Sequence, residues 1–177
     1  MTTALPEAPS DLEAISTQES SLLFPTFTAD TAYILGTALY TRLRSLSPSP
    51  CVINITLANS SQLLFHACTH PGTSPDNDVW VARKRATVMR WGCSSWYMNR
   101  KFAGSFEMSG EKEFAQNYML GESAGSYAIH GGGVPVRVKG VEGVVGVVVV
   151  SGLKQHEDHA VVVEGMGEVI KELEVNG

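Results

Sequence analysis

The spacing of apolar side chains along the chain predicts several amphipathic helices. Between residues 29 and 44, apolar or small residues recur every three or four positions, which places them on one face of a helix. Thr28 suits the N-cap of that helix, and the prolines that follow residue 44 suit its end. The same reasoning predicts helices over 11–21, 79–91, 95–102, 111–118 and 155–173. Ser10 is the expected cap of the helix over 11–21, and Asp76, Asn77 or Asp78 that of the helix over 79–91.

Four other segments have the composition of β-strands. Residues 51–57 and 63–69 are rich in β-branched and apolar side chains and are separated by a short turn, so we predict a hairpin. Residues 134–139 alternate between valine and other residues, and the proline among them favours an edge or the start of a strand. Residues 144–151 are apolar at almost every position, which predicts a strand covered on both faces.

The order of these elements predicts the fold class. Hairpins rather than helical crossovers join the strands, so we expect an α+β fold in which helices cover both faces of an antiparallel sheet. A glycine-rich turn over 104–110 and a loop over 121–126 separate the two halves. With 177 residues the chain is long enough for one domain. We assign that domain to residues 10–177 and expect a tail over 1–9.

Composition and charge exclude several classes of protein. The formal net charge of −5 argues against a general nucleic-acid binder, which needs many cationic side chains to neutralise phosphates. No apolar run approaches the about 20 residues of a membrane-spanning helix, so no membrane contact is expected. The three cysteines are widely spaced, which predicts reduced thiols in a cytoplasmic protein. The first residues lack the basic and apolar regions of a signal peptide.

The glycine triplet that follows His130 is the first candidate for a ligand site. Gly131, Gly132 and Gly133 let backbone amides approach a ligand closely, and such amides can hold an anion. The imidazole of His130 can bind a metal or move protons. The alternative is a tight turn that needs positive φ angles before a strand. The triplet matches neither the P-loop nor the dinucleotide-binding pattern of glycines.

The polar cluster at the start of the last helix is the second candidate. His156 and His159 lie three residues apart, so they share a helix face and, with Glu157 or Asp158, they suggest a transition-metal site. The alternative is that the two acidic residues stabilise the positive end of the helix dipole.

The third candidate combines a basic run with two serines. Arg83 and Lys84 precede Ser94 and Ser95, and cations followed by serines at a helix start suit a carboxylate or a phosphate. The alternative is that the basic run forms a solvated helix face.

Two blocks of sequence resemble one family. TSPDNDVWVARKRATVMRWGCSSWYM and HGGGVPVRVKG with GVVGVVVVSGLKQHEDHAVVVEGM resemble blocks of an uncharacterised fungal and bacterial branch of the GlcG/HbpS-like proteins, which are described as haem-degrading domains. The similarity covers about residues 10–170. The residues that match are Trp80, Arg83, Lys84, Ser94, Ser95, His130, Gly131, Gly132, Pro135, Arg137, Asp158 and His159.

The resemblance implies a fold, an assembly and a ligand. The implied fold is profilin-like, an α/β/α sandwich with a central antiparallel sheet of about five strands. The implied assembly is a homo-oligomer, either a dimer or an assembly of dimers. The implied cofactor is haem, although no iron ligand of other branches can be placed on a matching motif here.

Three functions are consistent with these residues. The favoured one is a small-molecule binding protein, for haem or another anionic ligand, with a pocket lined by the glycine triplet, the cations Arg83, Lys84 and Arg137, and His130, Ser94, Ser95, Asp158 and His159. The second is an enzyme for a small organic acid, in which Asp158 orients a histidine that acts as acid and base. The third is a non-catalytic adaptor that works through protein contacts.

Overall fold

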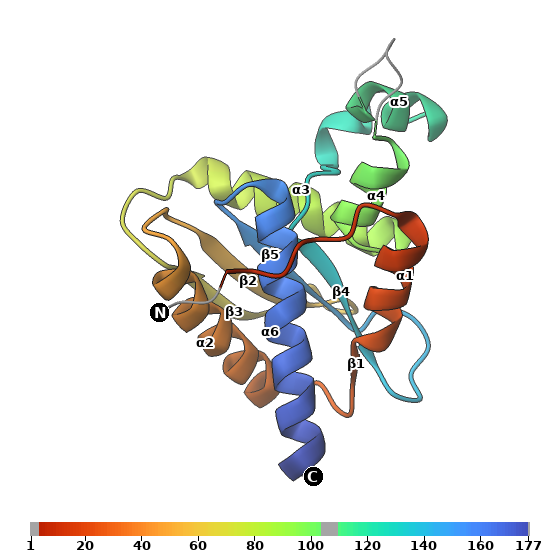
Figure 1. The fold of residues 1–177 in the computed structure, drawn as a ribbon. Coiled ribbons are helices and arrows are strands. Elements are labelled where there is room, and N and C mark those ends of the chain that lie inside the picture. The colour runs from red at the N-terminus through yellow and green to blue at the C-terminus, as the bar shows by residue number, and fades with distance from the viewer. Residues whose placement is uncertain (1–3, 104–109, 177) are drawn as a thin grey trace.

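The computed structural model describes residues 4–103 and 110–176, which fold into a five-stranded sheet between two layers of helices (Figure 1). The helices are α1 (Leu12–Ser21), α2 (Ala29–Leu46), α3 (Pro75–Trp91), α4 (Ser95–Lys101), α5 (Gly110–Asn117) and α6 (Gln155–Asn176), with a 3-10 helix η1 (Gly121–Ser126). The strands are β1 (Leu23–Phe24), β2 (Val52–Leu57), β3 (Leu63–Cys68), β4 (Gly133–Val138) and β5 (Gly146–Ser151).

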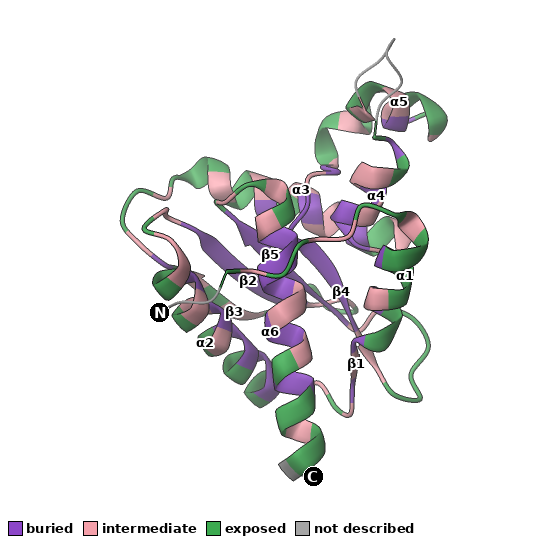
Figure 2. Ribbon diagram, viewed as in Figure 1, coloured by how far each residue is buried: buried purple, intermediate pink, exposed green. Residues whose placement is uncertain are grey.

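Strand β5 lies in the middle of the sheet and is covered on both sides, as its uniform valines predict. Val148 and Val150 belong to the large core beneath α2 and α6, whereas Val147 and Val149 pack with Val81 and other residues of α3 on the opposite face. All of these valines are buried, and Figure 2 shows the central strands as a buried layer. The two faces together remove most of the apolar surface of the strand from water, which is the main force that holds the three layers together.

The order of strands in the sheet is β1-β4-β5-β2-β3. The two predicted hairpins are present, and the pairing of β2 with β5 is antiparallel as well. The mixed α+β architecture with helices on both faces is therefore confirmed. One detail differs, because β1 pairs in parallel with β4, with Leu23 opposite Arg137. A two-residue strand is too short to show any alternation in the sequence, so no pattern predicts it.

Several helix boundaries differ from the predicted ones. The helix expected over 79–91 begins at Pro75, because Ser74 is its N-cap and forms a capping box with Asn77. Asp11 rather than Ser10 caps α1, and its side chain accepts a hydrogen bond from the Ala14 amide. The predicted loop over 121–126 forms η1. The glycine-rich turn expected over 104–110 lies outside the described residues apart from its last position, which begins α5.

The N-terminal segment packs along the domain surface. Residues 1–3 lie outside the described part of the chain, but Leu5 packs against the large core and the carbonyl of Pro9 accepts a hydrogen bond of 2.8 Å from Trp96 Nε1. Within residues 4–103 and 110–176, no helix combines the length and the apolar character that crossing a membrane requires.

Candidate functional site

The glycine triplet marks a point where three elements approach each other closely. A Cβ on Gly131 would collide with the carbonyl oxygen of Gln155, and one on Gly132 would collide with that of Val150. Gly132 also has a φ of +119°, which favours glycine. The Gly131 amide donates to Gln155 Oε1 at 3.4 Å and the Gly133 amide donates to Ser95 Oγ at 3.0 Å. The triplet therefore packs β4 against α6 and α4, and two of its amides already have protein acceptors.

Beside the triplet, Lys84 and Asp158 form a buried ion pair. Lys84 Nζ lies 3.0 Å from Asp158 Oδ2, and the two side chains are only 3% and 2% exposed. Lys84 also donates to the carbonyl of Val150 at 3.0 Å, and Asp158 accepts from the amides of Leu153 and Gly152. These bonds join α3, β5 and α6. Both charges have several polar partners, which is what a buried ion pair needs to offset the loss of water.

The environment of Asp158 changes the acidity of its carboxyl group. Burial raises its pKa to about 6, against the opposing effects of the Lys84 ammonium and the two backbone amides. A carboxyl group with a raised pKa that borders a cavity is a marker of functional sites.

His130 lies next to this pair and is half-exposed. Its ring packs edge-to-face on Trp80 with centroids 4.8 Å apart, and the Arg83 guanidinium lies 4.7 Å from the same indole. Nε2 lies 3.7 Å from a carboxylate oxygen of Glu111, while Nδ1 is buried and has no hydrogen-bond partner among the described residues. Burial lowers the pKa of His130, so the imidazole is neutral at pH 7.

These residues border one pocket of about 330 Å³, here called the His130 pocket. It is lined by Asp76, Asn77, Trp80, Lys84, His130, Ser151, Gly152, Leu153, Gln155 and Asp158. Asp76 and Asn77 belong to the first turn of α3, and Gln155 and Asp158 to the first turn of α6. The pocket therefore lies between the N-terminal ends of the two long helices that cover opposite faces of the sheet. Of the predicted ligand residues, it brings together His130, Lys84 and Asp158.

Other predicted residues have structural partners instead. Arg83 donates two hydrogen bonds to the carbonyl of Tyr127, and Ser95 binds the backbone of Gly133. Ser94 caps α4 by accepting from the Tyr97 amide, and its own amide donates to Glu19 Oε2 at 3.0 Å. The serines thus hold the turn between α3 and α4, and the Arg83 side chain holds the segment before His130.

The two histidines of the last helix do not share a site. His156 is exposed, whereas His159 is fully buried with its ring 6.1 Å from that of Trp96. Neither nitrogen of His159 has a hydrogen-bond partner within the described chain, and burial lowers its pKa to about 4. A search of the described residues finds no group of three metal-binding side chains. Neither histidine lines the His130 pocket.

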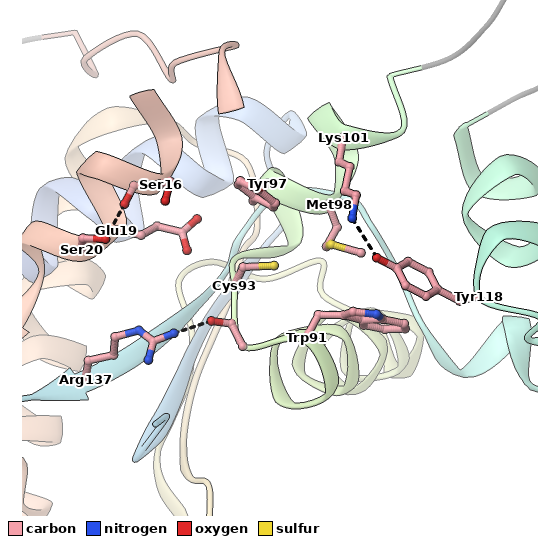
Figure 3. A pocket seen from close by; sticks show the side chains of 11 residues that line it. Ser16, Glu19, Ser20, Trp91, Cys93, Tyr97, Met98, Lys101, Tyr118 and Arg137 are labelled. Carbon is pink, nitrogen blue, oxygen red and sulfur yellow. Dashed lines mark hydrogen bonds between the residues drawn. The ribbon is translucent and has the colours of Figure 1, made fainter. Parts of the chain in front are cut away.

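Arg137 lines a different cavity of about 360 Å³, here called the Arg137 pocket (Figure 3). Its walls are Ser16, Glu19, Ser20, Trp91, Gly92, Cys93, Tyr97, Met98, Lys101, Tyr118 and Arg137. Sequence reasoning named only Arg137 among them. The others come from α1, the end of α3, the turn after it, α4 and the residue after α5, so no local motif in the sequence marks them as one site.

Comparison with known proteins identifies the family. Residues 27–167 match the model of the family described as haem degrading protein, HbpS-like. The chain belongs to the HbpS-like family. A UPF0303 protein of Streptomyces coelicolor is 44% identical over 97% of this chain and 100% of its own length. The UPF0303 protein YBR137W of Saccharomyces cerevisiae is 33% identical over 88% of this chain and 82% of its own length.

Solved structures of HbpS-like proteins share the fold. The crystal structure of the Ybr137w protein matches with a TM-score of 0.81 and 30% identity, over 92% of this chain and 88% of that one. Streptomyces reticuli HbpS, as a double mutant, matches with a TM-score of 0.59 and 19% identity over 80% of this chain and 86% of its own. The bacterial and fungal relatives confirm the branch that the two sequence blocks indicate.

Haem is the group that the HbpS-like description implies, and the His130 pocket offers it a poor fit. The cavity is near the lower limit of the roughly 300–1,000 Å³ of small-molecule sites, while haem is a wide macrocycle. Two of the three Lys84 N–H groups already serve Asp158 and Val150, and Arg83 does not line the cavity, so the charged donors that remain are too few for the two propionates of haem. His130 Nε2 faces Glu111. The residues present fit a smaller polar ligand better than haem.

Proposed function

We propose that this HbpS-like protein binds a small molecule with a carboxylate or a similar oxygen-rich anionic group in the His130 pocket. The observation that carries the proposal is an imbalance of hydrogen-bonding groups on the pocket wall. The acceptor oxygens are largely used within the protein, and several donors remain for a ligand.

The carboxylates in the pocket wall accept hydrogen bonds from groups of the protein itself. Asp158 accepts from Lys84, Gly152 and Leu153, and Asp76 accepts from Trp80 Nε1 at 3.1 Å. An ionised carboxylate only accepts, so the internal donors to both oxygens of Asp158 leave this group little capacity to bind a polar ligand. The Lys84 ammonium also offsets the charge of Asp158, so this buried carboxylate does not prevent an anion from binding, and Asp76 is exposed to solvent.

The donors are left in excess. Lys84 has three N–H groups, and two of them serve Asp158 and Val150. The Gln155 side chain accepts from Gly131 through Oε1, and the Asn77 side chain accepts from Ser74 through Oδ1. Both amides therefore keep an NH2 group for a ligand. The positive ends of the α3 and α6 dipoles favour negative charge at the same place.

The other two functions have less support from the geometry. Acid–base catalysis with Asp158 as the orienting carboxylate needs a histidine beside it, but the partner of Asp158 is Lys84 and the adjacent His159 is buried away from the pocket. An adaptor role rests on no particular observation.

We further propose that the protein forms homo-oligomers. Strand β3 lies at the edge of the sheet, and its Leu63 and the neighbouring Tyr33 of α2 are 55% and 66% exposed. An open sheet edge flanked by apolar side chains favours contact with a second chain. Light scattering after size exclusion tests this, and a monomer at micromolar concentration would contradict it.

Calorimetric titration with acetate, succinate and citrate tests the ligand proposal. We expect at least one of them to bind with a millimolar or lower dissociation constant, and His130→Ala to weaken that binding about tenfold. His156→Ala is the matched control, because His156 is exposed and lies outside the pocket. No binding of any probe, or equal loss in both variants, would contradict the proposal.

A further inference from the structure

We propose that the Arg137 pocket is a second, independent ligand site, and that it takes a small carboxylate which also carries a hydrogen-bond donor such as a hydroxyl group. Two cations in its wall, which form no ion pair within residues 4–103 and 110–176, account for the carboxylate. A buried carboxyl oxygen that has no hydrogen-bond partner in the same residues accounts for the donor.

The cations are Arg137 and Lys101. One nitrogen of the Arg137 guanidinium donates to the carbonyl of Gly92, and Lys101 Nζ donates to the hydroxyl of Tyr118 at 3.1 Å. Neither side chain forms an ion pair with a carboxylate in the described residues. Because a guanidinium has five N–H donors and an ammonium has three, both keep donors for an anion. The Tyr118 bond raises the pKa of Lys101, so its charge persists at neutral pH.

Glu19 places a buried carboxyl group on the wall of the same pocket. The residue is only 9% exposed, and its Oε2 accepts a hydrogen bond from the Ser94 amide. Its Oε1 is buried and has no partner among the described residues. An unsatisfied buried polar atom is rare and costs free energy, so such an atom on a cavity wall indicates that a donor is missing. A ligand hydroxyl would donate the missing hydrogen bond to Glu19 Oε1.

The side chains are arranged so that one molecule could meet both kinds of group. Figure 3 shows Glu19 reaching from α1 toward the cavity above Arg137, with Lys101 and Tyr118 on the opposite side and Cys93 between them. A carboxylate that meets Lys101 and a hydroxyl that meets Glu19 would therefore span the cavity. The apolar surfaces of Trp91 and Met98 line its wall and suit the carbon atoms of the ligand.

Cys93 does not make this a covalent site. Burial raises the pKa of its thiol to about 12, and the Glu19 charge acts in the same direction. The thiolate is the nucleophile, so a thiol with this pKa is unreactive at neutral pH. The pocket is therefore suited to reversible binding.

The two pockets are separable in an experiment because each contains its own tryptophan, Trp80 in the His130 pocket and Trp91 in the Arg137 pocket. No residue lines both. Binding at the Arg137 pocket should survive His130→Ala and Trp80→Phe. A ligand-induced change of fluorescence from this pocket should disappear with Trp91→Phe.

Calorimetric titration with lactate and propionate tests the proposal, since the two carboxylates are similar in size and only lactate has a hydroxyl group. We expect lactate to bind about tenfold more tightly, because its hydroxyl satisfies the buried Glu19 oxygen. Lys101→Gln should weaken both probes. Glu19→Gln should lower the preference for lactate, because an NH2 donor replaces one of the two carboxyl oxygens.

Arg100→Gln is the matched control, since it removes one positive charge from the adjacent position and Arg100 does not line the cavity. It should leave both affinities unchanged. Equal affinities for lactate and propionate, equal effects of Lys101→Gln and Arg100→Gln, or loss of lactate binding in His130→Ala would each overturn the proposal. Lys101 is exposed, so its replacement should not affect folding, and a melting curve verifies this.

Discussion

The two pockets contain similar charged residues, but these residues differ in their hydrogen-bond partners. In the His130 pocket the lysine and the aspartate are buried against each other and every oxygen of Asp158 has a donor. In the Arg137 pocket the two cations donate hydrogen bonds to neutral oxygens, and Glu19 Oε1 has no hydrogen-bond partner among the described residues. The first arrangement stabilises the fold and leaves donors at its edge, whereas the second leaves the charges themselves for a ligand. Pairing, rather than the number of charges, therefore distinguishes them.

Removing one member of the buried pair is expected to have the largest effect on stability. Lys84→Met leaves the Asp158 carboxylate buried without its cation, so we expect the free energy of unfolding to fall by about 3–5 kcal/mol. Lys101→Met removes a cation that lacks a charged partner and should change stability by less than about 0.5 kcal/mol. Urea unfolding at pH 7 measures both, and similar losses would show that the two pockets do not differ in this way.

The buried side chain of His159 makes the stability of the protein depend on pH. His159 has a folded-state pKa of about 4 against an ordinary 6.5, so the unfolded chain binds more protons between these values and stability falls as pH falls from 6.5 to 4. Asp158 acts in the opposite sense, because its pKa is raised to about 6 and the folded state binds more protons below that pH. His159→Leu removes only the first effect.

We therefore expect the stability of His159→Leu relative to wild type to grow as pH is lowered from 6.5 to 4, by up to roughly 3 kcal/mol. Urea unfolding of both proteins across this range measures the gap. A gap that stays constant with pH would show that His159 titrates normally in the folded protein.

A smaller effect is expected from the glycine that lets the buried pair form. Gly132→Ala introduces a side chain at a φ of +119° and against Lys84, Asp158 and Val150, so we expect a loss of about 2–3 kcal/mol. Gly140→Ala is the control, because its φ is also positive but a Cβ there meets open space. It should cost about 1 kcal/mol. Equal losses in thermal melts would mean that backbone strain alone, and not the closeness of the ion pair, explains the glycine.

The sequence predicts the architecture well because its signals are local. The uniform valines of β5 and the stripe on α2 each reveal their burial within a few residues. The start of α3 has a local signal too, since Ser74 and Pro75 are a typical N-cap and first helical residue, and the prediction of a cap at Asp76, Asn77 or Asp78 was wrong. The two-residue β1 had no such signal.

The sites are harder to predict because their contacts are distant in sequence. Lys84 and Asp158 are 74 positions apart, and Glu19 meets the Ser94 amide across 75. Three separate sequence motifs name Lys84, His130 and Asp158 as candidate ligand residues, and in the structure all three line one pocket. The sequence could not show that Ser94 and Arg83 form hydrogen bonds with backbone groups, or that Arg137 lines a separate cavity.

Nuclear magnetic resonance of the imidazole nitrogens is the most direct test of carboxylate binding in the His130 pocket. The protein would be labelled with 15N at its five histidines and titrated with succinate or citrate at pH 7. We predict that the His130 nitrogens shift in a saturable way and that those of the exposed His156 do not. Saturable shifts that leave His130 unchanged, or no shift at any histidine, would contradict the proposed site.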